Sequence, residues 1–164
     1  MKKLFFFLSV LAPVVCSAAD INKTPLPPIL YQNLIERLIP EVTEITRLPV
    51  PDEKPQVFVA DRNQIELAYC RDQRHDCHVA AITDDKTGEI ILSPALLQLN
   101  VFTASVVFHE LVHWAQVKNG MFTDEPDCIH WAKSEMHAYT AQSRFLEKQA
   151  GRGFPVPDLL AQCR

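Results

Sequence analysis

The sequence lacks three features that would each indicate a broad functional class. After Ala19, no stretch approaches the roughly 18 consecutive apolar residues that a membrane-spanning helix needs. Basic residues are in the minority, with 16 lysines and arginines against 20 aspartates and glutamates, so the charge does not indicate nucleic-acid binding. No internal repeat or low-complexity tract divides the chain. We therefore expect one domain whose chemistry resides in individual side chains.

The residues Met1 to Ala19 predict an export signal. Lys2 and Lys3 give a positively charged start, the following run to Val15 is apolar and short, and small residues at 17–19 offer a cleavage site. A run this short, followed by a polar segment, is too brief for a membrane anchor. We expect removal of the signal to leave residues 20–164 as a single periplasmic or secreted domain.

Cys16 raises the alternative of a lipoprotein. The residues before it are Val14 and Val15, where a small residue is normally required just ahead of a lipidated cysteine. The export signal without a lipid anchor is therefore the preferred interpretation. Loss of the two lysines with the signal would leave 14 basic and 20 acidic residues, a net charge of −6.

Four cysteines follow the predicted signal, and an even number in an exported chain favours disulfides over thiolate metal ligands. Three pairings are possible. We prefer Cys70 with Cys77, which closes a small polar loop, and Cys128 with Cys163, which ties down the C-terminal tail.

Hydrophobic periodicity and turn residues predict short strands among helices, an α+β fold with a small three-stranded sheet. An extended lead-in, Asp20–Pro28, precedes the first helix. The expected helices are Ile29–Ile39, stopping near Pro40 and followed by a turn of helix and then loop to Pro55, a short one after Ser93-Pro94 to Leu99, one from about Val101 to Lys118, and one that starts at Asp124, Pro126 and Asp127 and runs to about Ala150. The segment Arg62–Tyr69 is ambiguous, because three apolar residues alternate as in a strand while Asp61 is a good helix N-cap, and we favour a short helix. The expected strands are Val57–Ala60 and the hairpin His78–Thr83 with Glu89–Leu92.

The central helix carries the motif H-E-x-x-H, within V-V-F-H-E-L-V-H-W-A-Q. In a helix, His109 and His113 leave the same face about one turn apart, so one metal ion can bind both imidazoles. Glu110 lies about 100° around the helix from His109, near enough to hold a water but poorly placed as a ligand on that turn. These residue types at this spacing are typical of sites in which Zn²⁺ activates a bound water and the glutamate acts as general base.

The alternative is that both histidines are ordinary core residues with satisfied hydrogen bonds. The flanking residues make the helix apolar nearly all round, which predicts that it is buried. Two imidazoles and a carboxylate are costly to bury without a partner, and a metal ion is such a partner. The burial expected for this helix therefore favours the metal site.

A third ligand is expected from the following helix. There an apolar stripe is set by Trp131, Ala138, Tyr139 and Gln142, and Glu135 lies at its centre. His137 is about 200° and His130 about 140° away from Glu135 around the helix axis. Asp127 lies near the helix start, where capping is its expected task. Glu135 is therefore the predicted ligand.

With H-E-L-V-H followed by Glu135, the sequence resembles the gluzincin branch of zinc metallopeptidases. It is also similar to small exported bacterial proteins of unassigned function that carry H-E-L-V-H and a later E-x-x-A-Y, here residues 135–139. The resemblance covers about residues 89–145. It implies a zincin-like metallopeptidase fold with a small sheet, zinc held by His109, His113 and Glu135, and Glu110 as general base.

The sequence also departs from the related patterns. Gln116 and Asn119 stand where metzincins have a glycine and a third histidine, which excludes that branch. Many gluzincins place an aspartate four residues after the ligand glutamate to orient a ligand histidine, whereas this chain has Tyr139. The groups that hold the outer nitrogens of His109 and His113 must therefore differ.

The expected function is that of an exported zinc-dependent hydrolase acting on a peptide or protein substrate. Tyr139 is a candidate donor to the oxyanion, although a packing role explains it equally well. A second hypothesis is a zinc-containing, non-catalytic binding or inhibitory protein of the cell envelope. Glu110 argues against it, because a structural zinc site needs no such carboxylate. A third is amide hydrolysis in the cell wall, which the sequence does not distinguish from proteolysis.

Overall fold

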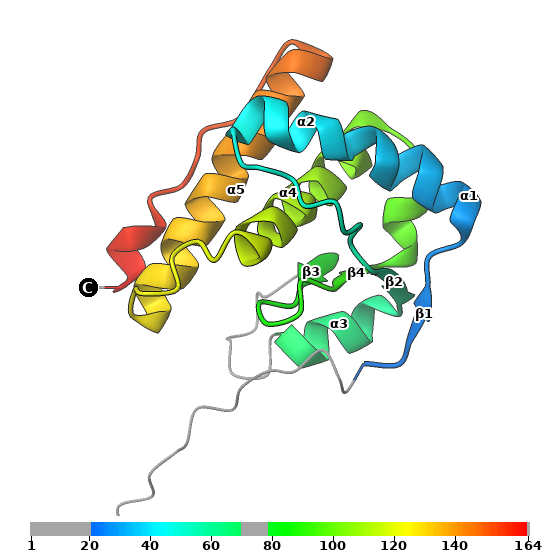
Figure 1. The fold of residues 1–164 in the computed structure, drawn as a ribbon, viewed down its shortest axis with the longest axis horizontal. Helices are drawn as coiled ribbons and strands as arrows, with labels where there is room; N and C mark the ends of the chain where they lie inside the picture. The colour runs from blue at the N-terminus through cyan, green and yellow to red at the C-terminus, as the bar shows by residue number, and fades with distance from the viewer. Residues whose placement is uncertain (1–20, 70–78, 164) are drawn as a thin grey trace, which may run out of the picture.

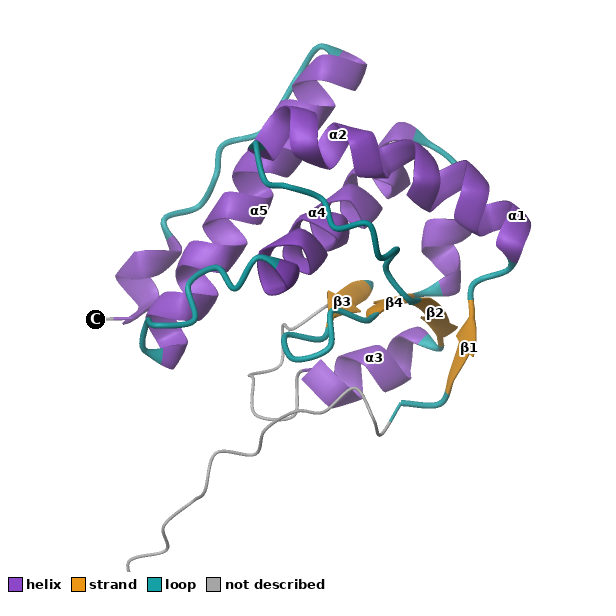
Figure 2. Cartoon of the chain, viewed as in Figure 1, coloured by secondary structure: helices purple, strands orange, loops and turns teal. Residues whose placement is uncertain are grey.

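The computed structural model describes residues 21–69 and 79–163, which form an α+β fold (Figure 1). The predicted export signal, Cys16 and the predicted Cys70–Cys77 bond lie outside these ranges. Within them, no helix is both long enough and apolar enough to span a membrane. The strands lie on one side of the central helix and the longest of the remaining helices on the other (Figure 2).

The first helical segment runs further than the sequence predicts. The elements α1 (Pro28–Leu30), a π-helical stretch (Tyr31–Glu36) and α2 (Arg37–Thr46) follow one another without a break, so the expected stop near Pro40 is wrong. A proline inside a helix removes one hydrogen bond and crowds the carbonyl four residues earlier. Here the wider π-helical turns precede it, and burial of Leu38 and Val42 holds α2 against the core.

The sheet has four strands among the described residues, not the three expected. Its order is β1 (Lys23–Pro25), β2 (Val57–Ala60), β4 (Ile90–Leu92) and β3 (Ala81–Thr83). β1 pairs antiparallel with β2, β2 parallel with β4, and β4 antiparallel with β3, which confirms the predicted hairpin. The additional strand, β1, lies in the segment that was expected to be an extended lead-in. Its sequence, Lys-Thr-Pro, has no apolar alternation that would predict a strand, and it is a strand because it pairs with β2.

The sheet is apolar on both faces. Ile90 and Leu92 of β4 belong to the core cluster that includes the central helix, whereas Ile91 points to the opposite face. There it joins Ile65 from α3 (Arg62–Tyr69). A helix therefore covers each face, with α4 on one and α3 on the other, which explains why all three residues of β4 are buried.

The central helix α4 (Val101–Lys118) has the predicted bounds, and the long helix α5 (Asp127–Ala150) begins at the last of the three predicted start residues and ends as predicted. Asn100 begins α4 with a capping box, in which its side chain accepts from the Thr103 N–H and the Thr103 side chain accepts from the Asn100 N–H. A short 3₁₀ helix, Pro94–Leu97, precedes it. α4 packs between the sheet and the pair α2 and α5 (Figure 1), and its middle is buried all round, as expected.

The C-terminal tail returns along α5 and ends in a 3₁₀ helix, Leu159–Cys163. The disulfide Cys128–Cys163 joins this helix to the first turn of α5, which confirms the predicted pairing. Ser143 adds a second attachment, since its hydroxyl donates to the Phe154 carbonyl and accepts from the Phe154 N–H. The tail is thus held at two points along α5.

Candidate metal centre

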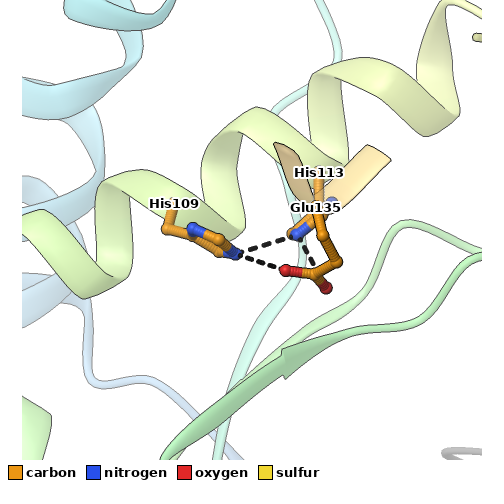
Figure 3. Close-up of side chains that lie close together, drawn as sticks. All are labelled: His109, His113 and Glu135. Carbon is orange, nitrogen blue, oxygen red and sulfur yellow. Dashed lines mark hydrogen bonds and ion pairs between the residues drawn. The ribbon is translucent and has the colours of Figure 1, made fainter. Parts of the chain in front are cut away.

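His109 and His113 project from one face of α4, as their four-residue spacing requires (Figure 3). Their Nε2 atoms are 3.0 Å apart and their rings meet edge to face. Both side chains are largely enclosed, because α4 is the central helix and α5 packs over this face. The two histidines therefore present two nitrogen atoms at one enclosed point.

Glu135 of α5 completes a three-residue group at that point. One carboxylate oxygen, Oε2, lies 3.3 Å from His109 Nε2, and the other, Oε1, lies 3.4 Å from His113 Nε2. Figure 3 shows the carboxylate facing both rings. One ligand atom from each of the three residues can be chosen so that all lie within 4.8 Å of one another, so the group could hold a metal ion. The predicted set His109, His113 and Glu135 is brought together.

The charges in this group are strongly coupled. Burial disfavours a charge on His113, but hydrogen bonding to Glu135 and its negative charge outweigh this and raise the pKa of His113 to about 9. Burial would likewise raise the pKa of Glu135, yet the two histidines hold it well below its usual range. Without a metal ion, a proton on His113 balances the carboxylate.

Glu110 lies on α4 beside this group but outside it. Its side chain is buried, and Oε2 accepts a hydrogen bond of 2.8 Å from the Thr83 hydroxyl of β3. The same hydroxyl lies 3.0 Å from the Glu110 carbonyl oxygen. The charge of Glu110 helps to raise the pKa of His113 and of Tyr139, so Glu110 lies near the site without joining the three-residue group.

The outer nitrogen of His113 has partners that the sequence did not reveal. Nδ1 lies 2.8 Å from Gln116 Oε1 and 3.1 Å from Ser134 Oγ. Gln116 also contacts His137, with its Nε2 2.9 Å from Nδ1 of that ring. His137 was expected to face away from Glu135, and it lies outside the metal group; instead it contacts the residue that supports His113.

His109 is supported differently. Its Nδ1 is buried and has no hydrogen-bond partner within residues 21–69 and 79–163. Its ring packs on the ring of Tyr139, with 4.6 Å between centroids. Packing therefore orients His109, whereas hydrogen bonds orient His113.

Two tyrosines border the site. Burial, followed by the charges of Glu135 and Glu110, raises the pKa of Tyr139. Tyr69, at the end of α3, was not among the predicted residues; burial and the charge of Glu135 raise its pKa to about 12, against a lowering by the hydrogen bond with Trp131. No motif connects Tyr69 to the H-E-x-x-H helix, and only the packing of α3 under the sheet brings it near.

The described fold and site together define an α+β protein with a largely enclosed His–His–Glu group able to hold a metal ion. The chain belongs to the family described as a domain of unknown function, DUF6647, whose model matches residues 30–152. That range contains the three residues of the group, together with Glu110 and Gln116. No curated protein and no solved structure gives a significant match.

Proposed function

We propose that this protein is an exported zinc-dependent metallopeptidase with a zincin-like arrangement of sheet, H-E-x-x-H helix and third-ligand helix. The observation that carries the proposal is the close approach of two imidazole nitrogens and the Glu135 carboxylate beside the buried carboxylate of Glu110. In a tetrahedral zinc site with bonds of about 2.0–2.1 Å, ligand atoms are about 3.3 Å apart. The two Nε2 atoms are 3.0 Å apart, and each lies near that distance from a different oxygen of the Glu135 carboxylate, His109 3.3 Å from Oε2 and His113 3.4 Å from Oε1.

The identity of the donors also favours zinc. Two imidazole nitrogens and one carboxylate oxygen form the ligand set of catalytic zinc sites, which keep a fourth position for water or substrate. Harder cations such as Ca²⁺ and Mg²⁺ prefer oxygen ligands in greater number. Bound zinc would supply Lewis-acid chemistry, polarising a substrate carbonyl and making water acidic.

Glu110 is the proposed general base. Thr83 holds one of its oxygens, Oε2, and so fixes the carboxylate in direction. Oε1 then accepts the proton of the attacking water and passes it to the leaving amine. The buried position of Glu110 keeps its charge from being screened by solvent.

Tyr139 is the proposed donor to the oxyanion of the tetrahedral intermediate. Its raised pKa keeps the hydroxyl protonated at neutral pH, which a hydrogen-bond donor requires. Its contact with His109 places its ring beside one of the proposed ligands.

The disulfide supports the proposed location outside the cytosol. Structural disulfides persist in oxidising compartments and are rare in the cytosol, where thiols are kept reduced. Cys128–Cys163 is such a bond, since it attaches the tail to α5.

The test is hydrolysis of a diverse peptide library by the zinc-loaded protein, with new termini mapped by mass spectrometry. Glu110→Gln should retain about one zinc per chain and lose activity by about 10²–10⁴-fold, since it removes the base and no ligand. Glu147→Gln is the matched control, because it makes the same chemical change at an exposed position at the end of α5. Zinc-loaded wild-type protein that cleaves no peptide would refute the proposal and favour a non-catalytic binding protein.

A further inference from the structure

We infer that Gln116 is a positioning residue that sets the tautomer and ring orientation of His113, so that Nε2 faces His109 and Glu135. The inference rests on the proposed metal site, because it assigns a support to one of the proposed ligands. It arises from four contacts that connect Gln116 to His113, Ser134 and His137.

The contacts determine which end of the Gln116 side-chain amide is the oxygen and which is the nitrogen. The carbonyl oxygen of Ser134 can only accept, and the Gln116 side chain meets it at 3.1 Å, so the amide nitrogen must lie at that end. The amide oxygen is then directed to the Nδ1 atom of His113, at 2.8 Å. An oxygen there can only accept, so Nδ1 of His113 must carry a proton.

The position of that proton decides the chemistry of the opposite nitrogen. A neutral imidazole with its proton on Nδ1 has a lone pair on Nε2, and this lone pair is what a metal ion binds. Nε2 of His113 is the atom that lies 3.4 Å from Glu135 and 3.0 Å from His109. Gln116 thus selects the tautomer that the site requires.

The support is itself held in place. Gln116 is only 3% exposed, and the Ser134 hydroxyl donates to its oxygen at 2.7 Å. Its nitrogen has a second acceptor in His137 Nδ1. Rotation of the amide by half a turn would set its nitrogen against the Nδ1 proton of His113 and its oxygen against the Ser134 carbonyl, and would leave these buried groups unpaired.

Gln116 thus provides the hydrogen bond to the outer nitrogen of His113, whose partner the sequence did not identify. Many gluzincins have an aspartate four residues after the ligand glutamate, and this aspartate orients a ligand histidine. In this chain that position is Tyr139, which contacts His109 through its ring. The orienting hydrogen bond to His113 comes instead from its own helix, three residues further on, where side chains are neighbours.

The experiment compares wild-type protein with Gln116→Met, which keeps the length of the side chain and removes both hydrogen-bonding ends. Zinc affinity, measured by competition with a chelator, should fall about 10–100-fold, the range found for residues that support metal ligands. In nuclear magnetic resonance spectra, the His113 Nδ1 proton should exchange faster with solvent than in the wild type, because its nearer acceptor is gone and only the Ser134 hydroxyl oxygen, at 3.1 Å, remains.

Gln142→Met is the matched control. Gln142 is also buried, and it also bridges α4 and α5, by donating to the Ser105 hydroxyl at 3.2 Å, but it has no hydrogen bond to either histidine. Its zinc affinity and the His113 proton signal should match those of the wild type. A merely structural role for Gln116 predicts equal effects in both variants and would overturn the inference.

Ser134→Ala keeps the inference testable if Gln116→Met does not fold. It removes one donor to Gln116 and one contact of His113, and should weaken zinc binding by a few-fold with faster exchange of the Nδ1 proton. Wild-type affinity and exchange in the folded variants would overturn the inference while leaving the metal site intact. Wild-type protein that binds no zinc would instead refute the proposed function. The role of Gln116 would then be decided by the exchange rate of the His113 Nδ1 proton in metal-free protein, which should be faster in Gln116→Met than in the wild type.

Discussion

Between α4 and α5, the end that holds Phe108 and Phe145 differs from the end that holds His113 and Glu135. At the first end the two phenylalanine rings stack with 4.7 Å between centroids. At the second end the contacts are hydrogen bonds and charges, and they converge on one point. The same pair of helices therefore carries a mainly apolar half, which also contains the Gln142–Ser105 hydrogen bond, and a polar half.

The difference separates the apolar packing that stabilises the fold from the group that could hold a metal ion, along one interface. Burying a phenylalanine contributes a few kcal/mol to folding. The polar half contains a cost instead: His109 Nδ1 is buried without a partner in the described structure, and such an atom costs about 1–3 kcal/mol. We interpret the apolar half as the part that keeps the helices together while the polar half holds groups that suit a ligand.

Removal of a proposed ligand should give the largest effect. Glu135→Ala should abolish stoichiometric zinc binding, because only two donor atoms of the group remain. His137→Ala, two residues away on the same helix, should keep about one zinc per chain, since His137 lies outside the group. Metal analysis after gel filtration measures both. Zinc lost from His137→Ala and retained by Glu135→Ala would show that the ligand has been assigned to the wrong residue.

Truncation in the apolar half should have the next largest effect. Phe108→Ala removes a fully buried ring that stacks on Phe145, and should lower the free energy of unfolding by about 3–5 kcal/mol. Urea denaturation of metal-free protein measures this change. The folded variant should still bind zinc, because Phe108 supplies no donor atom; loss of the metal from folded protein would mean that the two halves are not separable.

Change of pH should have a smaller, graded effect on the polar half. The pKa of His113 is raised to about 9 in the metal-free protein, so a metal ion must displace its proton below that pH. Apparent zinc affinity should therefore rise about tenfold per unit from pH 6.5 to pH 9 and then level off. Chelator competition across this range tests it, and affinity independent of pH would contradict the assigned coupling to Glu135.

The same proton has the opposite effect on the metal-free fold. A folded-state pKa above the ordinary value of 6.5 gives a stabilisation that is complete below pH 6.5 and lost as the pH rises through about 9. Thermal unfolding with a chelator present should therefore show falling stability over that window. The paired group Glu135 has a lowered pKa, so its contribution is lost only in acid.

Local sequence signals predicted the helices well. The bounds of α3, α4 and α5 agree with the expectation, because caps, periodicity and stop residues act over a few neighbouring positions. The expected position of Glu135 beside the two histidines is confirmed for the same reason, since a helical stripe can be read from steps of three and four.

The errors lie where distant residues decide the structure. β1 has no strand signal of its own and exists through its pairing with β2. The helix continues past Pro40 because π-helical turns and the burial of Leu38 and Val42 accommodate it. In both cases tertiary contacts overrode a local preference.

The sequence alone determined that two histidines share one face of a buried helix, and that Glu135 lies at the centre of the stripe that faces them. Only the tertiary structure decided what surrounds these groups: Thr83 of β3 at Glu110, Tyr69 of α3 near Glu135, and Gln116 between His113 and Ser134. The physical reason is that the two kinds of information depend on different geometry. A helical face follows from spacing along the chain, whereas a hydrogen bond between elements depends on their positions to within a few tenths of an ångström.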